Sequence, residues 1–223
     1  MTKQTIRWTA VGLVAAGLGL WAGAAAAETY NVRVTNLTRG QIISPPVVAA
    51  HLPDVAVFAA GEEASEGLAA LAEDAASALL VADLIGAGAD VEEAAGGIPP
   101  GGYIDVVITT SAGNTQISAV GMLVTTNDAF FALNGVDLPA DSATYSVPAY
   151  DAGSEANNEN CDYIPGPPCG NGGVRDTDGA EGFVHIHNGI HGDTSSSGKL
   201  QADRDDWRNP VARVTVTLVE DPS

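Results

Sequence analysis

The chain has 223 residues and a formal charge of −19, with 28 acidic residues against nine lysines and arginines. So acidic a surface repels nucleic acid and anionic membranes, and no lysine-rich patch interleaved with aromatic residues offsets it, so we expect neither as a partner. The length suits one domain with a sizeable core.

Residues 1–27 have the pattern of a secretory signal peptide. A basic start with Lys3 and Arg7 precedes an apolar run, and three alanines at 25–27 offer small residues for cleavage. A retained membrane anchor is the alternative, but the run is short and ends in the cleavage pattern. We therefore expect a secreted protein, extracellular or periplasmic, made of residues 28–223. Its charge would be −21, because the signal carries two basic residues and no acid.

Alternating apolar and polar residues predict strands along the mature chain. The alternation is clear at 30–35 and again at 212–218, and further β-branched runs lie at 101–110, 115–127 and 182–187. Because these strands follow one another without a βαβ rhythm, the sequence predicts an all-β fold, an antiparallel β-sandwich.

One segment has helical spacing instead. Its apolar residues are Leu68, Leu71, Ala72, Ala75 and Leu79. They predict one short amphipathic helix over roughly 64–75, inserted between early strands. The Gly- and Pro-rich stretch 86–102 is predicted to be loop. Residues 139–181 are predicted to form a long polar loop, and loops of that length are usually functional or held by something. No linker or repeat interrupts residues 28–223, so we expect one domain.

Cys161 and Cys169 are the two cysteines of the chain. In an oxidising compartment two nearby cysteines usually pair, and this bridge would contribute about 2–3 kcal/mol by constraining the unfolded chain. Metal ligation is the weaker interpretation, because the spacing matches no common zinc motif. We expect a disulfide that closes a Pro- and Gly-rich loop.

The stretch "YDAGSEANNEN" at 150–160 gathers three acids and three asparagines. It is not an EF-hand, because the residues required at positions 3, 6 and 12 are missing. Calcium does not need that motif, since it takes six to eight oxygens and tolerates irregular loops. Asp151 and Glu155 are candidate calcium ligands, and Asp128 lies just past another strand. The alternative is a solvated polar loop.

Five landmarks occur in order along the chain: "TNLTRGQIISPPVVAAH", "GEEASEGLAALAED", "SAVGMLVTTNDAFFALNG", "VPAYDAGSEAN" and "DWRNPVARVTVTL". Together they resemble the spondin N-terminal domain, the F-spondin-type module, in its bacterial secreted form, over nearly all of 29–219. The resemblance implies a C2-like sandwich, a calcium ion held by loop carboxylates, and a role in extracellular adhesion or matrix binding. It places Asp128, Asp151 and Glu155 in the calcium site.

Three of the four histidines lie in "HIHNGIH". On a strand His185 and His187 point to the same face, and His191 returns across a glycine-containing turn, so the three are a candidate zinc or copper site. The alternative, favoured because short His-x-His pairs arise readily by chance, is that they hydrogen-bond to the acidic surface and pack on Trp207. For His51 we expect a structural hydrogen bond.

The sequence thus predicts a secreted, non-catalytic, calcium-binding module that binds an extracellular protein or glycan. It contains no Gly-x-Ser-x-Gly elbow, and neither cysteine resembles a free nucleophile. The alternative is a zinc- or copper-binding protein, or a metal-dependent hydrolase, that uses the three clustered histidines.

Overall fold

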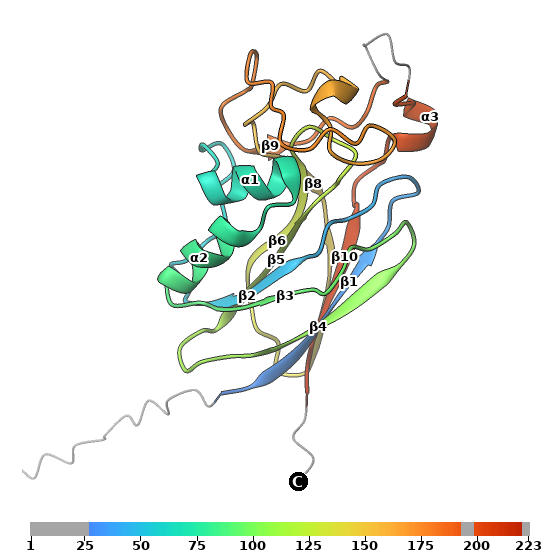
Figure 1. Cartoon of the computed structure of the whole chain (residues 1–223). Coiled ribbons are helices and arrows are strands. Elements are labelled where there is room, and N and C mark those ends of the chain that lie inside the picture. Colours follow the sequence, from blue (N-terminus) through green and yellow to red (C-terminus); the bar gives the residue numbers. More distant parts are fainter. Residues whose placement is uncertain (1–26, 193–198, 220–223) are drawn as a thin grey trace, which may run out of the picture.

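Two antiparallel sheets face each other in the computed structural model, which describes residues 27–192 and 199–219 (Figure 1). The four-stranded sheet has the order β4-β1-β10-β7, made of β1 (Thr29–Asn36), β4 (Tyr103–Thr109), β7 (Ser142–Val147) and β10 (Ala212–Leu218). The six-stranded sheet has the order β3-β2-β5-β6-β8-β9, made of β2 (Val47–His51), β3 (Asp90–Glu93), β5 (Gln116–Met122), β6 (Ala129–Asp137), β8 (Ala149–Asp151) and β9 (His185–Ile186). The predicted β-sandwich is confirmed. The predicted signal peptide lies outside the described residues, apart from Ala27.

The four-stranded sheet has one buried and one wet face. Val32 and Val34 of β1 pair with Val216 and Val214 of β10, and all four side chains are buried in the core between the sheets. The residues that alternate with them point outward and are polar. This is the period-2 pattern that the sequence shows at both ends of the mature chain.

The six-stranded sheet is covered on both faces. Val48 and Phe131 pack toward the other sheet, whereas Val47 and Phe130 belong to a second cluster together with residues of the two longer helices. A strand that is buried on both sides is apolar throughout and shows no alternation. For this reason β2 and β6 are absent from the sequence-based prediction.

Helix α1 (Glu66–Asp74) lies where the helical spacing predicts it. Ser65 caps its first turn by accepting the N–H of Leu68 at 3.2 Å, and Ala75 ends it in the left-handed region with φ of 56°. A second helix, α2 (Ala78–Gly86), follows directly and was not predicted. Both lie against the six-stranded sheet (Figure 1). No helix within the described residues is long and apolar enough to cross a membrane.

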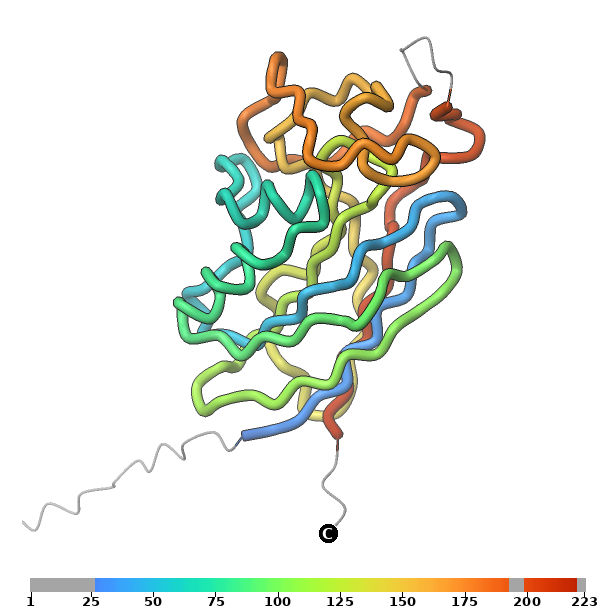
Figure 2. The backbone as a smooth tube through the Cα atoms, viewed as in Figure 1, coloured from blue at the N-terminus to red at the C-terminus, as the bar shows by residue number. Residues whose placement is uncertain are grey.

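The chain between β8 and β10 covers one end of the sandwich (Figure 2). We call its described residues, 152–192 and 199–211, the cap; it contains the 3-10 turn η1 (Cys161–Tyr163), β9 and the short helix α3 (Ala202–Asp205). The start of β1 and the end of β10 lie at the opposite end of the sandwich (Figure 1). Cys161 and Cys169 form the predicted disulfide within the cap.

Two predicted loops contain strands. The stretch 139–181 includes β7 and β8, and the stretch 86–102 includes β3. β7 pairs with β10, β8 with β6, and β3 with β2. Because these partners are not adjacent in the sequence, local composition gives little sign of the strands.

Candidate metal centre

Strand pairing gathers three candidate side chains beneath the cap. Asp151 ends β8, where it lies opposite Ala129 of β6 on one side and opposite His185 of β9 on the other. Asp128 immediately precedes Ala129. Because directly opposed residues of an antiparallel pair project from the same face, Asp151 and His185 are neighbours.

A glycine turn brings a further acid to this place. The N–H of Gly153 donates to Asp151 Oδ1 at 2.8 Å, and Gly153 has φ of +67°. A Cβ on Gly153 would lie 2.4 Å from the carbonyl oxygen of Phe183, so only glycine allows this approach. The segment held against the turn contains Glu181, and Asn157 Nδ2 donates both to Asp151 Oδ2 at 2.6 Å and to Glu181 Oε1 at 3.1 Å.

The ligand atoms of Asp151, Glu181 and His185 all lie within 4.8 Å of one another. A metal ion with bonds near 2.0–2.2 Å holds its ligand atoms about 3–4 Å apart, so small side-chain shifts would close the set around an ion. Asp151 is fully buried, whereas Glu181 is exposed. The cluster therefore opens to solvent on the side of Glu181.

His185 is oriented as a metal ligand. Its Nδ1 lies 3.0 Å from the carbonyl oxygen of Ile186, and because a carbonyl only accepts, Nδ1 carries the hydrogen. The lone pair is then on Nε2, which lies 3.7 Å from Asp151 Oδ1. Metal-binding histidines usually donate their other ring nitrogen to a carbonyl or a carboxylate in this way.

His187 has the opposite arrangement. The N–H of Gly189 donates to its Nδ1 at 2.9 Å, so the neutral ring carries its hydrogen on Nε2. Burial lowers the pKa of His187 to about 4, so the ring is neutral at pH 7. Its Nε2 lies 3.7 Å from Asp151 Oδ2, and the ring packs on Trp207 at 5.1 Å between centroids. His187 is therefore placed to direct an N–H toward Asp151, and its packing on Trp207 agrees with the sequence analysis.

Three buried side-chain atoms of the described residues have no hydrogen-bond partner, and all belong to this site: Asp128 Oδ1, His185 Nε2 and His187 Nε2. Buried polar atoms in folded proteins are almost always paired. Burial, followed by the charge of Asp151, raises the pKa of Asp128 to about 7, and burial also raises the pKa of Asp151. Two buried carboxyls with raised pKa values thus lie close enough for their charges to act on each other.

The other predicted ligands lie apart from this cluster. The Glu155 backbone N–H donates to Asp128 Oδ2 at 3.0 Å, while its own carboxylate accepts the N–H of Asp176 at 3.0 Å. The ring of His191 contacts Glu159, with Nδ1 3.1 Å from Oε1, and its side chain is 77% exposed. Within the described residues Asp151 is thus grouped with Glu181 and His185, and neither Glu155 nor His191 joins them.

His51 has the structural role expected of it. Its side chain is fully buried, its Nδ1 donates to the carbonyl of Leu52 at 2.9 Å, and its Nε2 lies 2.8 Å from Ser118 Oγ. Ser118 Oγ in turn accepts the N–H of Gly135. This chain of hydrogen bonds occupies both ring nitrogens, so His51 has none left for a metal.

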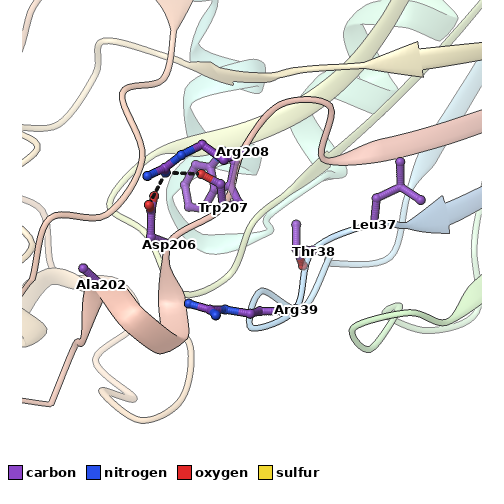
Figure 3. A pocket seen from close by; sticks show the side chains of 7 residues that line it. All are labelled: Leu37, Thr38, Arg39, Ala202, Asp206, Trp207 and Arg208. Carbon is purple, nitrogen blue, oxygen red and sulfur yellow. Dashed lines mark hydrogen bonds and ion pairs between the residues drawn. The ribbon is translucent and has the colours of Figure 1, made fainter.

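A separate pocket of about 490 Å³ lies between the loop that follows β1 and the residues that follow α3 (Figure 3). Arg39 enters it from one wall, and Trp207, Asp206 and Arg208 form the other. Arg208 is paired with Asp206 and also donates to the carbonyl of Trp207 at 2.7 Å. Trp207 is shared between this pocket and the packing of His187, so the pocket and the candidate metal centre are neighbours.

No protein-family model and no curated protein sequence matches this chain. The resemblance to the spondin N-terminal domain therefore rests on the sequence landmarks and stays a prediction.

Proposed function

We propose that this protein is a non-catalytic, metal-binding β-sandwich module that acts outside the cytoplasm, with a divalent transition metal held by Asp151, Glu181 and His185. The observation that carries the proposal is the concentration of unpaired buried atoms at one place: Asp128 Oδ1 and the Nε2 atoms of His185 and His187. A cation there would be bound by His185 Nε2 and would provide a countercharge for Asp128 Oδ1. His187 would orient Asp151 through its Nε2–H.

The donor set favours zinc or a similar ion over calcium. Calcium prefers an all-oxygen shell, whereas imidazole suits zinc, copper, iron and nickel. The clustered atoms are two carboxylates and one imidazole nitrogen. The predicted calcium site at Asp128, Asp151 and Glu155 would use Asp151 as well, so the two ions would compete for the same carboxylate.

The metal would act structurally. Asp151 belongs to the six-stranded sheet, whereas Glu181 lies within the cap, so an ion that joins them would fix the cap to the sandwich. The disulfide within the cap supports export to an oxidising compartment. An ordered cap on a rigid sandwich suits the predicted role in extracellular binding.

The proposal is tested by calorimetric titration of the chelator-treated protein with zinc, copper and calcium in separate experiments. We expect one zinc ion per chain, and we expect Asp151→Asn, Glu181→Gln and His185→Ala each to weaken zinc binding at least a hundredfold. Glu92→Gln is the matched control, because Glu92 is an exposed acid on the distant strand β3.

Two results would overturn the assignment. Tight calcium binding without zinc binding, abolished by Glu155→Gln, would favour the predicted calcium site instead. Zinc binding that survives His185→Ala but is lost in His191→Ala would move the metal to the other end of the histidine motif.

A further inference from the structure

The outer face of the four-stranded sheet carries a shallow groove of about 520 Å³, whose lining shares no residue with the candidate metal centre. The two longer helices cover the other sheet, so this face is open to solvent (Figure 1). The groove is lined by Asn31, Arg33, Thr35, Thr144, Arg213, Thr215 and Thr217. Each of these side chains carries a hydrogen-bond donor, and none of them is acidic.

Two arginines lie side by side in the groove. Arg33 of β1 is opposite Thr215 of β10, and Arg213 is opposite Thr35, so the arginines are diagonal neighbours. Diagonal residues of an antiparallel pair lie roughly 7–8 Å apart, a distance at which two guanidinium groups repel unless an anion lies between them.

One of the two arginines lacks a counterion. Arg33 is held by Asp105, at 2.9 Å from Nε and 2.7 Å from Nη2, and stacks over the ring of Tyr103 at 4.2 Å. Arg213 is exposed and has no carboxylate or other hydrogen-bond partner among the described residues. Arg39, in the pocket of Figure 3, is the other exposed arginine of the described residues whose side chain has no such partner. That pocket, however, has Asp206 in its lining, where it already neutralises Arg208, whereas no acid lines the groove beside Arg213.

Hydroxyl groups held by cross-strand hydrogen bonds extend along the groove from Arg213. Thr144 and Thr215 bond across the strands at 3.1 Å, and Ser142 and Thr217 do so at 3.0 Å. Side chains fixed on a sheet lose little freedom on binding, and hydroxyls both donate and accept. Tyr103, 59% exposed at the edge of the same face, adds an aromatic surface.

We propose that this groove binds a saccharide carrying a single carboxylate, of the uronic acid type. The carboxylate would pair with Arg213, whose planar fork matches it, and the sugar hydroxyls would bond to Asn31 and the threonines. A long polyanion does not fit, because the strongly acidic remainder of the protein repels it. This site is independent of the metal centre.

The test is titration of the ¹⁵N-labelled protein, followed by amide chemical shifts, with cellobiouronic acid and with its neutral counterpart cellobiose. We expect shift changes confined to β1, β7 and β10, and binding of the acid at least ten times tighter than that of cellobiose. Equal binding of both sugars, shifts centred elsewhere, or no shifts would overturn the proposal.

Variants separate the sugar contacts from simple anion binding. Arg213→Gln should weaken binding at least tenfold, while Arg208→Gln, an exposed arginine outside the groove, should leave it unchanged. Thr215→Val should weaken binding of cellobiouronic acid but not of acetate. Acetate or a diglutamate peptide binding as tightly as the sugar acid would reduce the groove to a general anion site and overturn the proposal. Amide spectra that are unchanged outside β1, β7 and β10 verify that the groove variants fold.

Discussion

At the scale of single residues, His185 and His187 differ in the hydrogen bond that Nδ1 makes. His185 donates from Nδ1 to a carbonyl, whereas His187 accepts an N–H there. The first therefore offers a lone pair at Nε2, and the second offers a hydrogen. A sequence motif such as His-x-His treats the two as equivalent, and the structure does not.

This difference predicts opposite tautomers in the metal-free protein at neutral pH. Long-range ¹H–¹⁵N spectra should show His185 protonated at Nδ1 and His187 protonated at Nε2. In metal titrations, His185→Ala should cost at least a hundredfold in zinc affinity, whereas His187→Gln, which keeps a terminal N–H, should cost about tenfold, as expected for a residue that only orients a ligand. Equal losses in the two variants would mean that both rings bind the metal.

Gly153 provides a second prediction at this scale. Gly153→Ala places a methyl group against the backbone of Phe183 at a positive φ, so the turn must open. We expect a loss of about 1–3 kcal/mol in stability and a loss of zinc affinity, because Glu181 moves away from Asp151. Denaturant unfolding and zinc titration measure the two effects. Gly182→Ala is the control, because a Cβ there meets nothing within 4 Å, although its φ of +78° carries a strain of its own. Wild-type zinc affinity in Gly153→Ala would contradict this account.

Of the six ligands predicted from the sequence, Asp151 and His185 belong to the cluster, Asp128 and His187 have unpaired buried atoms beside it, and Glu155 and His191 do not join it. The sequence does not nominate Glu181, which lies four residues before His185 in "EGFVH". The only local sign is an acid shortly before a histidine-bearing strand. Glu181 reaches Asp151 through the contact of Gly153 with Phe183 and through Asn157, and neither link can be read from spacing along the chain.

At the scale of elements, α1 holds part of the cap. Buried Glu73, at the end of α1, pairs with Arg175 at 2.5 Å, and Asp74 accepts the N–H of Gly173 at 2.7 Å. Burial is the largest influence on Glu73 and raises its pKa, while the charge of Arg175 opposes the rise. Arg175 therefore offsets part of the cost of burying this carboxyl.

Arg175→Met should destabilise the protein in a pH-dependent way. Without Arg175 the pKa of Glu73 rises further, and an acid whose pKa is raised on folding loses stability as the pH rises through the folded-state pKa. We expect a cost of about 1–2 kcal/mol at pH 7.5, less than for a fully buried pair because Arg175 is half exposed, and almost none at pH 4. Denaturant unfolding at both pH values tests this, with Arg39→Met as the control. The same cost at both pH values would contradict it.

β1 and β10 were predictable because their residues alternate, and β4 and β5 because β-branched residues run through them, whereas β2 and β6, which are covered on both faces, were not. β1 and β10 alternate because one side of each faces water. β2 is buried along its whole length and shows no alternation, whereas α2 buries only Leu80 and Leu84 and leaves the apolar Leu79 and Ile85 exposed, so neither has a clear period. β3, β7 and β8 are set by distant partners. The sequence therefore gives the sandwich and the inserted helix but not the three-layer arrangement of helices, six-stranded sheet and four-stranded sheet.

At the scale of the whole molecule, a bound metal would link the cap to the sandwich. A ligand present at about 100 times its dissociation constant adds about 2.7 kcal/mol to the folded state. For a domain of this size that corresponds to a rise of about 5–10 °C in the melting temperature. We expect this rise when zinc is added to the chelator-treated protein, and no rise in Asp151→Asn. A rise of equal size in Asp151→Asn would place the stabilising ion elsewhere.

The most direct test of the metal centre is an anomalous difference map at the zinc edge from crystals grown with zinc. We predict one strong peak bonded to His185 Nε2, with oxygen ligands from Asp151 and Glu181 and with His187 outside the coordination shell. No peak beneath the cap, or a peak bonded to His191 and Glu159 instead, would contradict the proposed site.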